Sequence, residues 1–409
     1  MSLTKEEIIL KTVNIWNENN FQDISLSPVA KALGISKPAL YKHFRDKEEL
    51  IVEIYEYFTA ELENIWRLFF NKQKGFSGNI LRLLIRYLAT YFQEKPECLI
   101  FKKNMLVNKM LADKICKLQI GNVLTVEEID ELYDKFEKSG YAIRKTKSFF
   151  IYLMTIVETW MVLQSDLIKN RDIKVEKYPK ETLVDVCVDQ VAEIVESGFF
   201  KSNGGKSVDI LKIEEEIEKS GDGSELPEDD VFNAIADIII EDGYWNISVN
   251  KIASKLGMVK SSLYNYFKNK KMMIGGSLFK RWENLKKYFK ENIFHRDNGF
   301  EVWYSLIYFS YRLFSSNIRH AVMMNWIAIK GYKIKEKSQI FDILLEDYKI
   351  KIPENKKLFC GVFCFPLMVV QILIVRYVFF ILLQGMSLDL EEIRNIYNLS
   401  VYGIKKGEL

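Results

Sequence analysis

Basic residues gather in two short segments of the chain, where their charge could hold the phosphates of a nucleic acid. Between Ser27 and Lys47 there are five basic residues and a single acid, Asp46, and between Lys251 and Lys271 there are six lysines and no acid. The formal net charge of the whole chain is only +3, so both segments are local excesses of positive charge. Contacts to a phosphate backbone require patches of this kind.

The two segments are copies of one another. A shift of 223 positions, which places Ala30 on Ala253, brings Glu18–Leu50 onto Glu241–Met273 without a gap. Further identities in this alignment are Leu33/Leu256, Gly34/Gly257, Leu40/Leu263, Tyr41/Tyr264, Phe44/Phe267 and Lys47/Lys270. Chance does not produce such agreement, so the chain contains a tandem duplication.

Each copy carries the signals of two short helices joined by a tight turn. We expect Ser27 to cap the first helix of copy one, with Pro28 in its first turn, and Asn250 to cap the corresponding helix of copy two. Gly34 and Gly257 stand where that helix must end, because glycine adopts the left-handed conformation at low cost.

The second short helix of each copy has an apolar side and an outward side. Ser36 can cap this helix in copy one, whereas its counterpart Val259 cannot. The apolar seam consists of Val29, Ala30, Leu33, Ile35, Leu40 and Phe44. The seam leaves outward-facing residues that differ between the copies: Lys37, Pro38, Ala39, Lys42 and His43 in the first, and Lys260, Ser261, Ser262, Asn265 and Tyr266 in the second.

These motifs resemble a known family. Residues 30–50, Ala-x-x-Leu-Gly-Ile-Ser-Lys-Pro-Ala-Leu-Tyr-Lys-His-Phe-x-x-Lys-Glu-Glu-Leu, are similar to the DNA-binding signature of the TetR repressor family. Residues 253–270 resemble it too, with Val259 and the run Lys271-Met272-Met273 as departures. The segments that follow match the family only in length and helical character.

The resemblance implies roles for individual residues. Those expected to touch phosphates are Tyr41, His43 and Lys47, and in copy two Tyr264, Tyr266 and Lys270. Those expected nearest the bases are Lys37, Pro38 and Lys42, and in copy two Lys260, Ser261 and Asn265. Ser27, Ser36, Asn250 and Ser262 complete the candidate DNA-binding set. Two alternatives stay open: the paired tyrosines could be core aromatics, and His43 could be a solvent-exposed residue without a role.

The rest of the chain has a helical pattern, and we expect an all-α protein. Thr4 and Glu7 predict a capping box, and Pro227 opens the equivalent helix of copy two. Long amphipathic segments are Ile80–Gln93, Ser148–Leu167 and Lys180–Glu196 in copy one, and Glu301–Ser315, Leu358–Gln384 and Leu390–Ile404 in copy two. No convincing alternating strand pattern occurs.

The expected organisation is two TetR-like units in tandem. Helix-turn-helix domains are expected at 1–50 and 227–273, with helical regulatory and dimerisation domains at 51–200 and 274–409. The Gly/Ser-rich stretch 201–226 has the composition of a linker, and its middle, Val208–Lys219, could form a short exposed helix. Because family members act as two-fold dimers, the two units could pair within one chain as an intramolecular pseudo-dimer. Further homo-oligomerisation stays possible.

One apolar segment could be taken for a membrane span. Leu358–Gln384 is long enough to cross a bilayer, but it contains Gln371 and Arg376, which are costly there. A buried bundle helix explains it better, so we expect no membrane partner. The chain start lacks the apolar core of a signal peptide, and the five cysteines are odd in number and scattered, which indicates a cytoplasmic protein.

Catalytic and metal-binding residues are not evident. The three histidines, His43, His295 and His320, are far apart, and no phosphate loop or nucleophile motif occurs, so we expect no enzyme and no cofactor. Cys360 and Cys364 lie one helical turn apart among apolar residues, which favours a core role over a metal site.

A ligand site is expected in the helical domains. Candidate pocket walls are the aromatic stretch Phe300–Phe314 and its counterpart Leu81–Phe92, although aromatic helical stripes are as often a filled core. Arg376 could anchor an acidic ligand or pair with Glu158 across a bundle.

These observations predict a ligand-responsive transcriptional repressor. Its partners would be a double-stranded DNA operator and a small-molecule effector. The alternative is a helical scaffold protein in which one or both helix-turn-helix units no longer bind DNA.

Overall fold

The structure, a computed structural model, describes residues 3–18, 25–105, 123–143, 147–164, 180–199, 208–221, 229–242, 247–296, 298–323, 369 and 389–405. Every regular element in these ranges is an α-helix, and the single β-bridge joins Tyr141 to Lys405. The expected all-α class is confirmed. The first unit contains α1 (Lys5–Glu18), α2 (Leu26–Ala32), α3 (Lys37–Leu40), α4 (Lys47–Gln73), α5 (Ile80–Glu94), α6 (Pro96–Met105), α9 (Val126–Lys138), α10 (Lys147–Gln164) and α11 (Lys180–Ser197).

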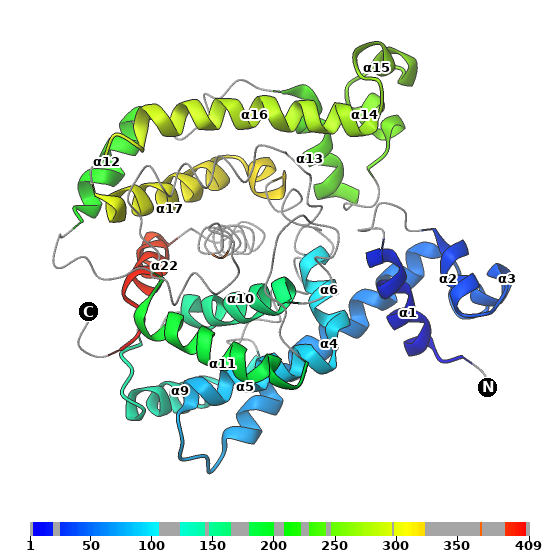
Figure 1. Ribbon diagram of the computed structural model, residues 1–409. Coiled ribbons are helices and arrows are strands. Elements are labelled where there is room, and N and C mark those ends of the chain that lie inside the picture. The colour runs from blue at the N-terminus through cyan, green and yellow to red at the C-terminus, as the bar shows by residue number, and fades with distance from the viewer. Residues whose placement is uncertain are drawn as a thin grey trace.

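Helices α13–α17 of the second unit repeat the order of α1–α5 of the first (Figure 1). The boundaries predicted at 50 and 273 fall inside the long helices α4 and α16, which therefore connect each helix-turn-helix to the body of its unit. Helix α12 (Ile210–Ser220) stands between the units. The second unit contains α13 (Asp230–Asp242), α14 (Val249–Lys255), α15 (Lys260–Tyr266), α16 (Lys270–Asn292), α17 (Gly299–Ser316) and α22 (Leu390–Tyr402).

Local sequence signals explain where several helices begin. The capping box expected at α1 is present: the Thr4 backbone N–H donates to Glu7 Oε2 at 2.8 Å, and the Glu7 N–H donates to Thr4 Oγ1 at 3.1 Å. Asp46 caps α4 by accepting from the Glu49 N–H at 2.7 Å, which satisfies a donor that the first turn leaves open.

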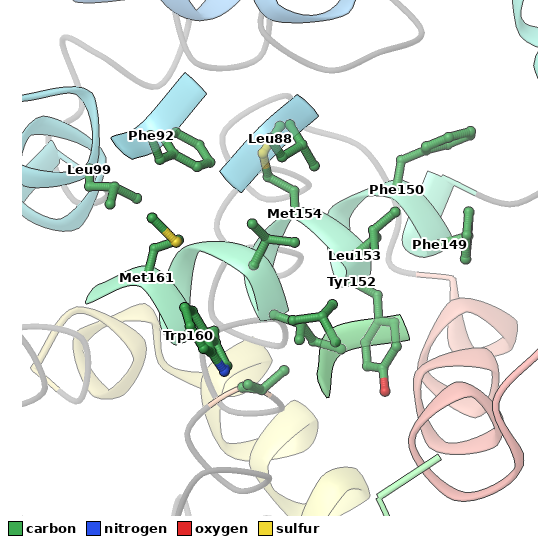
Figure 2. Close-up of a cluster of buried hydrophobic side chains, with 14 of the residues drawn as sticks. Leu88, Phe92, Leu99, Phe149, Phe150, Tyr152, Leu153, Met154, Trp160 and Met161 are labelled. Atoms are coloured by element: carbon green, nitrogen blue, oxygen red, sulfur yellow. The ribbon is translucent and has the colours of Figure 1, made fainter. Parts of the chain in front are cut away.

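The centre of the molecule is one apolar core shared by both units. Figure 2 shows side chains of α10 directed toward Leu88 and Phe92 of α5, and all of these are buried. On another face of α10, the Tyr152 hydroxyl donates to the Leu399 carbonyl of α22 at 3.3 Å. The same core includes Trp160 of the first unit and Trp303 of the second, so burial of apolar surface holds the two units together.

The closest approach between the units occurs where α11 and α22 end. Gly198 and Gly403 follow these two helices with φ of 72° and 69°. A Cβ on Gly198 would lie 2.2 Å from the Val401 carbonyl oxygen, and a Cβ on Gly403 would lie 2.3 Å from the Glu196 carbonyl oxygen. Each helix end therefore fits against the other in the same reciprocal way, as in a two-fold interface. The Phe199 N–H donates to the Ser400 carbonyl across this contact at 2.7 Å, and the Ile404 N–H donates to Glu196 at 3.2 Å.

Helix α12 corrects one expectation. The helix predicted at Val208–Lys219 forms, but only one face of it is exposed: Ile213 and Ile217 are buried in the shared core, and α12 packs along α17. Its apolar residues at i and i+4 lie on one face, and a partner helix covers that face. Part of the segment predicted as a linker is therefore an integral element of the second unit.

Some expectations fall on residues outside the described ranges. These are Pro227, Cys116, Cys360, Cys364, Gln371 and Arg376, together with all of Leu358–Gln384 except the buried Val369. The pairing of Arg376 with Glu158 stays a prediction for this reason. Within the described ranges, no helix combines the length and the apolar character that a membrane crossing requires.

The glycine crossing generates a stability prediction. Gly198→Ala and Gly403→Ala should each lower the unfolding free energy more than Gly140→Ala does, by about an additional 1–3 kcal/mol for the forced backbone shift. Gly140 is the matched control, because its φ is 88° but a Cβ there would meet nothing within 4 Å, so only the left-handed conformation costs about 1–2 kcal/mol. Urea unfolding midpoints measure the difference. Equal losses at the three positions would contradict the crossing.

Candidate DNA-binding interface

The turns of the two helix-turn-helix units match bond for bond. Gly34 and Gly257 have φ of 68° and 64°, as their sequence positions predict. In copy one the Ile35 N–H donates to the Ala30 carbonyl at 3.0 Å. In copy two the Met258 N–H donates to the Ala253 carbonyl at 2.9 Å. A Cβ on either glycine would meet nothing within 4 Å. Glycine is therefore needed for its backbone conformation, which ends the first helix.

The caps agree with the sequence in the second helix and differ in the first. Ser36 Oγ accepts from the Ala39 N–H at 3.3 Å, as expected, and Val259 makes no side-chain cap. Ser27 and Asn250 are not caps, because α2 and α14 begin earlier, with Ser25 and Ser248 at the N-cap positions. In copy two the capping bond forms: Ser248 Oγ accepts from the Lys251 N–H at 3.2 Å, whereas Ser25 makes no side-chain cap.

The earlier start follows from packing. Leu26 is buried in the core, and it reaches that position as the first residue of α2. Ser27 and Asn250 thus lie in the first turns of their helices, where both are exposed. They remain available to a partner as side chains on the helix surface.

The outward residues lie at the surface as the seam predicts. The exposed ones are Lys37, Pro38, Lys42, Lys260, Ser261 and Asn265, while Ala39, His43, Lys47 and Ser262 are half-buried. The seam itself is buried, with Val29, Ala30, Leu40 and Phe44 in the core and Leu33 and Ile35 packed against it.

The paired tyrosines are surface residues. Tyr41 is 41% exposed, Tyr264 is 45% exposed and Tyr266 is 74% exposed, so neither member of the pair is a core aromatic. His43 lies beside Phe44, with ring centroids 6.4 Å apart. The two recognition elements differ in length, because α3 ends at Leu40 and leaves Tyr41–His43 in a turn, whereas α15 continues through Tyr266.

The positive patch of copy two is weaker than its residue count indicates. Lys251 Nζ lies 2.7 Å from Asp242 Oδ2, and Lys255 Nζ lies 2.7 Å from Glu241 Oε1. The hydrogen bond that Lys255 donates to Glu241 raises the pKa of Lys255 above its usual value. Both acids belong to the preceding helix α13, outside the segment in which the lysines were counted. Copy one has Pro28 and Ala32 at the aligned positions, so it has no counterpart of these two pairs.

The residues before Lys47 and Lys270 also differ between the copies. Asp46 precedes Lys47 and pairs with Arg45 at 3.2 Å, and the backbone N–H of Glu49 lowers the pKa of that aspartate. The neutral Asn269 takes its place in copy two and caps α16 by accepting from the Met272 N–H at 2.9 Å. The side chain of Lys270 lies outside the described residues.

Polar contacts tie each unit's first helix to the helix that follows α5 or α17. In copy one Asn14 of α1 donates to Glu97 of α6 at 2.8 Å. In copy two Asp237, at the position aligned with Asn14, accepts from Arg319 Nε at 2.7 Å and from its Nη2 at 3.1 Å. Figure 1 shows α2–α3 and α14–α15 on the same side of the molecule, away from α9 and α22. Both helix-turn-helix units therefore lie on one side of the molecule.

Comparison with known proteins agrees with this geometry. The pattern of the family described as "Bacterial regulatory proteins, tetR family" matches the chain twice, at residues 8–54 and 231–275. The HTH-type transcriptional regulator AcrR of Shigella flexneri is 30% identical over 115 residues, which are 26% of this chain and 52% of that protein. The match thus spans about half the length of that relative. The chain therefore contains two TetR-like units in tandem, one at each of these matches.

Proposed function

We propose that this chain is a cytoplasmic, ligand-responsive transcriptional repressor that binds one DNA operator with both of its helix-turn-helix units. The observation that carries the proposal is the pair of matching turns, each of which presents exposed polar and aromatic side chains on the same side of the molecule (Figure 1). The apolar seam behind each turn is buried, and these side chains lie on the opposite, exposed side. A gel-shift assay with genomic fragments tests DNA binding directly.

The pseudo-dimer is supported by the contact between the units. The reciprocal fit of Gly198 and Gly403, and the bond from Tyr152 to Leu399, join the first unit to the second within one chain. An ordinary family dimer uses two chains to present two reading helices, and here one chain presents both.

The expected stoichiometry follows from that contact. Light scattering should give a particle of 48.1 kDa, and titration should saturate one operator with one chain. Lys42→Ala, at an exposed position, provides the control, because it should weaken operator binding and leave the association state unchanged. A chain that is always a dimer and needs two copies per operator would contradict the pseudo-dimer, whereas weak further association would not.

The two reading surfaces indicate a non-palindromic operator. The aligned exposed positions carry Pro38 and Lys42 in copy one but Ser261 and Asn265 in copy two. Proline can meet a thymine methyl, and asparagine pairs best with adenine. A fused pair is free of the symmetry that a homodimer imposes on its operator. We therefore propose different half-sites about one helical turn, roughly 34–36 Å, apart.

Asn265→Ala should relax specificity in one half-site only, with a loss of about 1–3 kcal/mol there. Lys42→Ala is the matched change at the aligned position of copy one, and it should affect the other half-site. Selection of binding sites from a random library measures both effects. A symmetric consensus that shifts equally for both variants would show that the two units read DNA alike.

Lys47 and Lys270 are proposed phosphate anchors. Lys47→Ala and Lys270→Ala should each weaken binding evenly across sequences, and each should lower the slope of log K against log salt by about one. Binding titrations between low and moderate salt give the slope. Glu215→Ala, on the exposed face of α12, is a suitable control and should leave it unchanged. An unchanged slope for Lys270→Ala alone would mean that the second unit does not contact DNA.

The ion pairs of Lys251 and Lys255 favour a second candidate function. These pairs remove part of the positive charge from the surface of copy two, as expected of a unit that has become a scaffold for the first. In that case the chain would protect a single half-site from nuclease digestion. Protection of two half-sites separates the repressor from this alternative.

A further inference from the structure

Helix α12 lies between α11, the last helix of the first unit, and α13, where the second family match begins. It nevertheless packs along α17 of the second unit and buries Ile213 and Ile217 in the shared core. Helix α5, the counterpart of α17, packs on α10 and α11 of its own unit. The second regulatory domain therefore carries an added element, supplied by the segment between the units.

The most buried polar contact of this element is a carboxylate site. Arg394 Nε donates to Glu214 Oε1 at 3.0 Å, and Arg394 Nη2 donates to Glu214 Oε2 at 2.8 Å. The Tyr304 hydroxyl also donates to Oε1. The Glu214 residue is only 7% exposed and Tyr304 is fully buried. A planar fork with an added hydroxyl is the donor set that recognises a carboxylate in two-point fashion.

Contact with Glu214 raises the pKa values of both Arg394 and Tyr304. The hydrogen bonds that Arg394 donates to Glu214 are the main cause that raises the pKa of Arg394, and burial followed by the hydrogen bond to Glu214 raises the pKa of Tyr304. Arg394 therefore stays charged and Tyr304 stays protonated near neutral pH, so both side chains are hydrogen-bond donors to a carboxylate at that pH.

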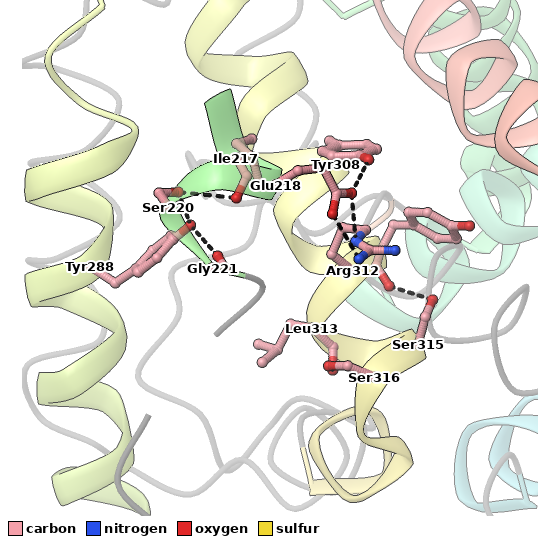
Figure 3. A network of polar contacts seen from close by, with 11 residues as sticks. Ile217, Glu218, Ser220, Gly221, Tyr288, Tyr308, Arg312, Leu313, Ser315 and Ser316 are labelled. Carbon is pink, nitrogen blue, oxygen red and sulfur yellow. Dashed lines mark hydrogen bonds and ion pairs between the residues drawn. The ribbon is translucent and has the colours of Figure 1, made fainter. Parts of the chain in front are cut away.

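Two further acidic side chains hold α12 in place. Figure 3 shows Glu218 between the Tyr308 hydroxyl, at 2.5 Å, and Arg312, whose Nε is 2.8 Å away. Glu216 lies 2.7 Å from Arg296 Nη1. The Glu218 pair is partly exposed, and contacts of that kind contribute little. The Arg296 side chain is only 7% exposed, so its pair with Glu216 is a second partly buried attachment of α12.

The surroundings of the anchor are apolar and aromatic. Tyr304 packs edge-on against Tyr397 with centroids 5.0 Å apart, and it stacks with Tyr308 at 6.2 Å. On the other side the anchor is bounded by Ile213 and Ile217 of α12 itself. If α12 moved away, a fixed cation and hydroxyl would stand beside a space that fits an apolar group.

We propose that Arg394 and Tyr304 form a ligand site for small amphipathic carboxylates, which Glu214 of α12 occupies as a built-in ligand. A carboxylate with an apolar or aromatic body takes the place of Glu214 together with its neighbouring isoleucines. This inference rests on the proposed ligand-responsive function and names the chemical class of its effector.

The tether sets the concentration at which a free ligand competes. A group held on a short connection has an effective concentration in the mM range, so the native chain responds only to ligands that outcompete Glu214. Removal of the Glu214 carboxylate removes the competitor and takes the main partner from Arg394, whose side chain is 28% exposed and also lies 3.8 Å from Glu391, so we expect a loss of stability. A free carboxylate then restores the missing partner.

Thermal unfolding of the full chain tests the site, with benzoate as the probe and benzamide as its neutral isostere at equal ionic strength. Glu214→Ala should lower the Tm, and benzoate should raise it again in a saturable way. Its half-saturating concentration should be at least tenfold lower for Glu214→Ala than for the unaltered chain. Benzamide should have no such effect, and Arg394→Ala in the Glu214→Ala background should abolish the response to benzoate.

Glu215→Ala is the matched control, because Glu215 is exposed and pairs only with Lys219 at 2.6 Å among the contacts of the described residues. It should change neither the Tm nor the response. An equal effect of benzoate and benzamide, or a response that survives Arg394→Ala, overturns the proposal. If Glu214→Ala does not fold, Glu214→Gln keeps the side-chain volume, and its indifference to benzoate overturns the proposal equally.

These measurements contain no DNA, so they separate the two levels of inference. A chain that shifts its operator in a gel but ignores benzoate retains the proposed regulatory function and loses the carboxylate site. A chain that responds to benzoate as described but never shifts DNA keeps the site and loses the regulatory function.

Discussion

The whole arrangement depends on the absence of two side chains where α11 and α22 cross. The helix ends approach until each carbonyl stands where the other chain segment would carry a Cβ, and only Gly198 and Gly403 permit this. The crossing places α22 on α10 and α11, so the second unit completes the core of the first. Through α4 and α16 that core in turn determines where the two helix-turn-helix units stand. A backbone contact of a few residues therefore sets how the two units meet at α11 and α22.

Local chemistry made much of this predictable from the sequence. The left-handed Gly34 and Gly257, the Ser36 cap and the Thr4–Glu7 box all depend on residues within four positions of one another. The helix starts at α2 and α14 were wrong because serine or asparagine occurs at two nearby positions in each copy, and in copy one the burial of Leu26 decides between them. That burial depends on packing partners far away in the chain.

Long-range partners explain what else the sequence did not reveal. The sequence of helix α12 predicts a polar helix at the surface. In the structure, arginine and tyrosine side chains roughly 80 to 180 positions further along the chain pair with its glutamates. The lysines of copy two likewise looked unopposed because Glu241 and Asp242 belong to the helix before them. A count of charge along one segment cannot include acids that folding brings from another.

Joining both halves covalently changes how such a protein responds to its own abundance. A pair of separate subunits dissociates on dilution, and the concentration of the pair grows with the square of the subunit concentration at low levels. Here the α11–α22 contact forms within one molecule, so its extent is the same at few copies or at many. Activity should then rise in direct proportion to the number of chains. A unit that carries a damaging substitution also cannot be exchanged for an intact unit from another chain, so the damage persists in that molecule.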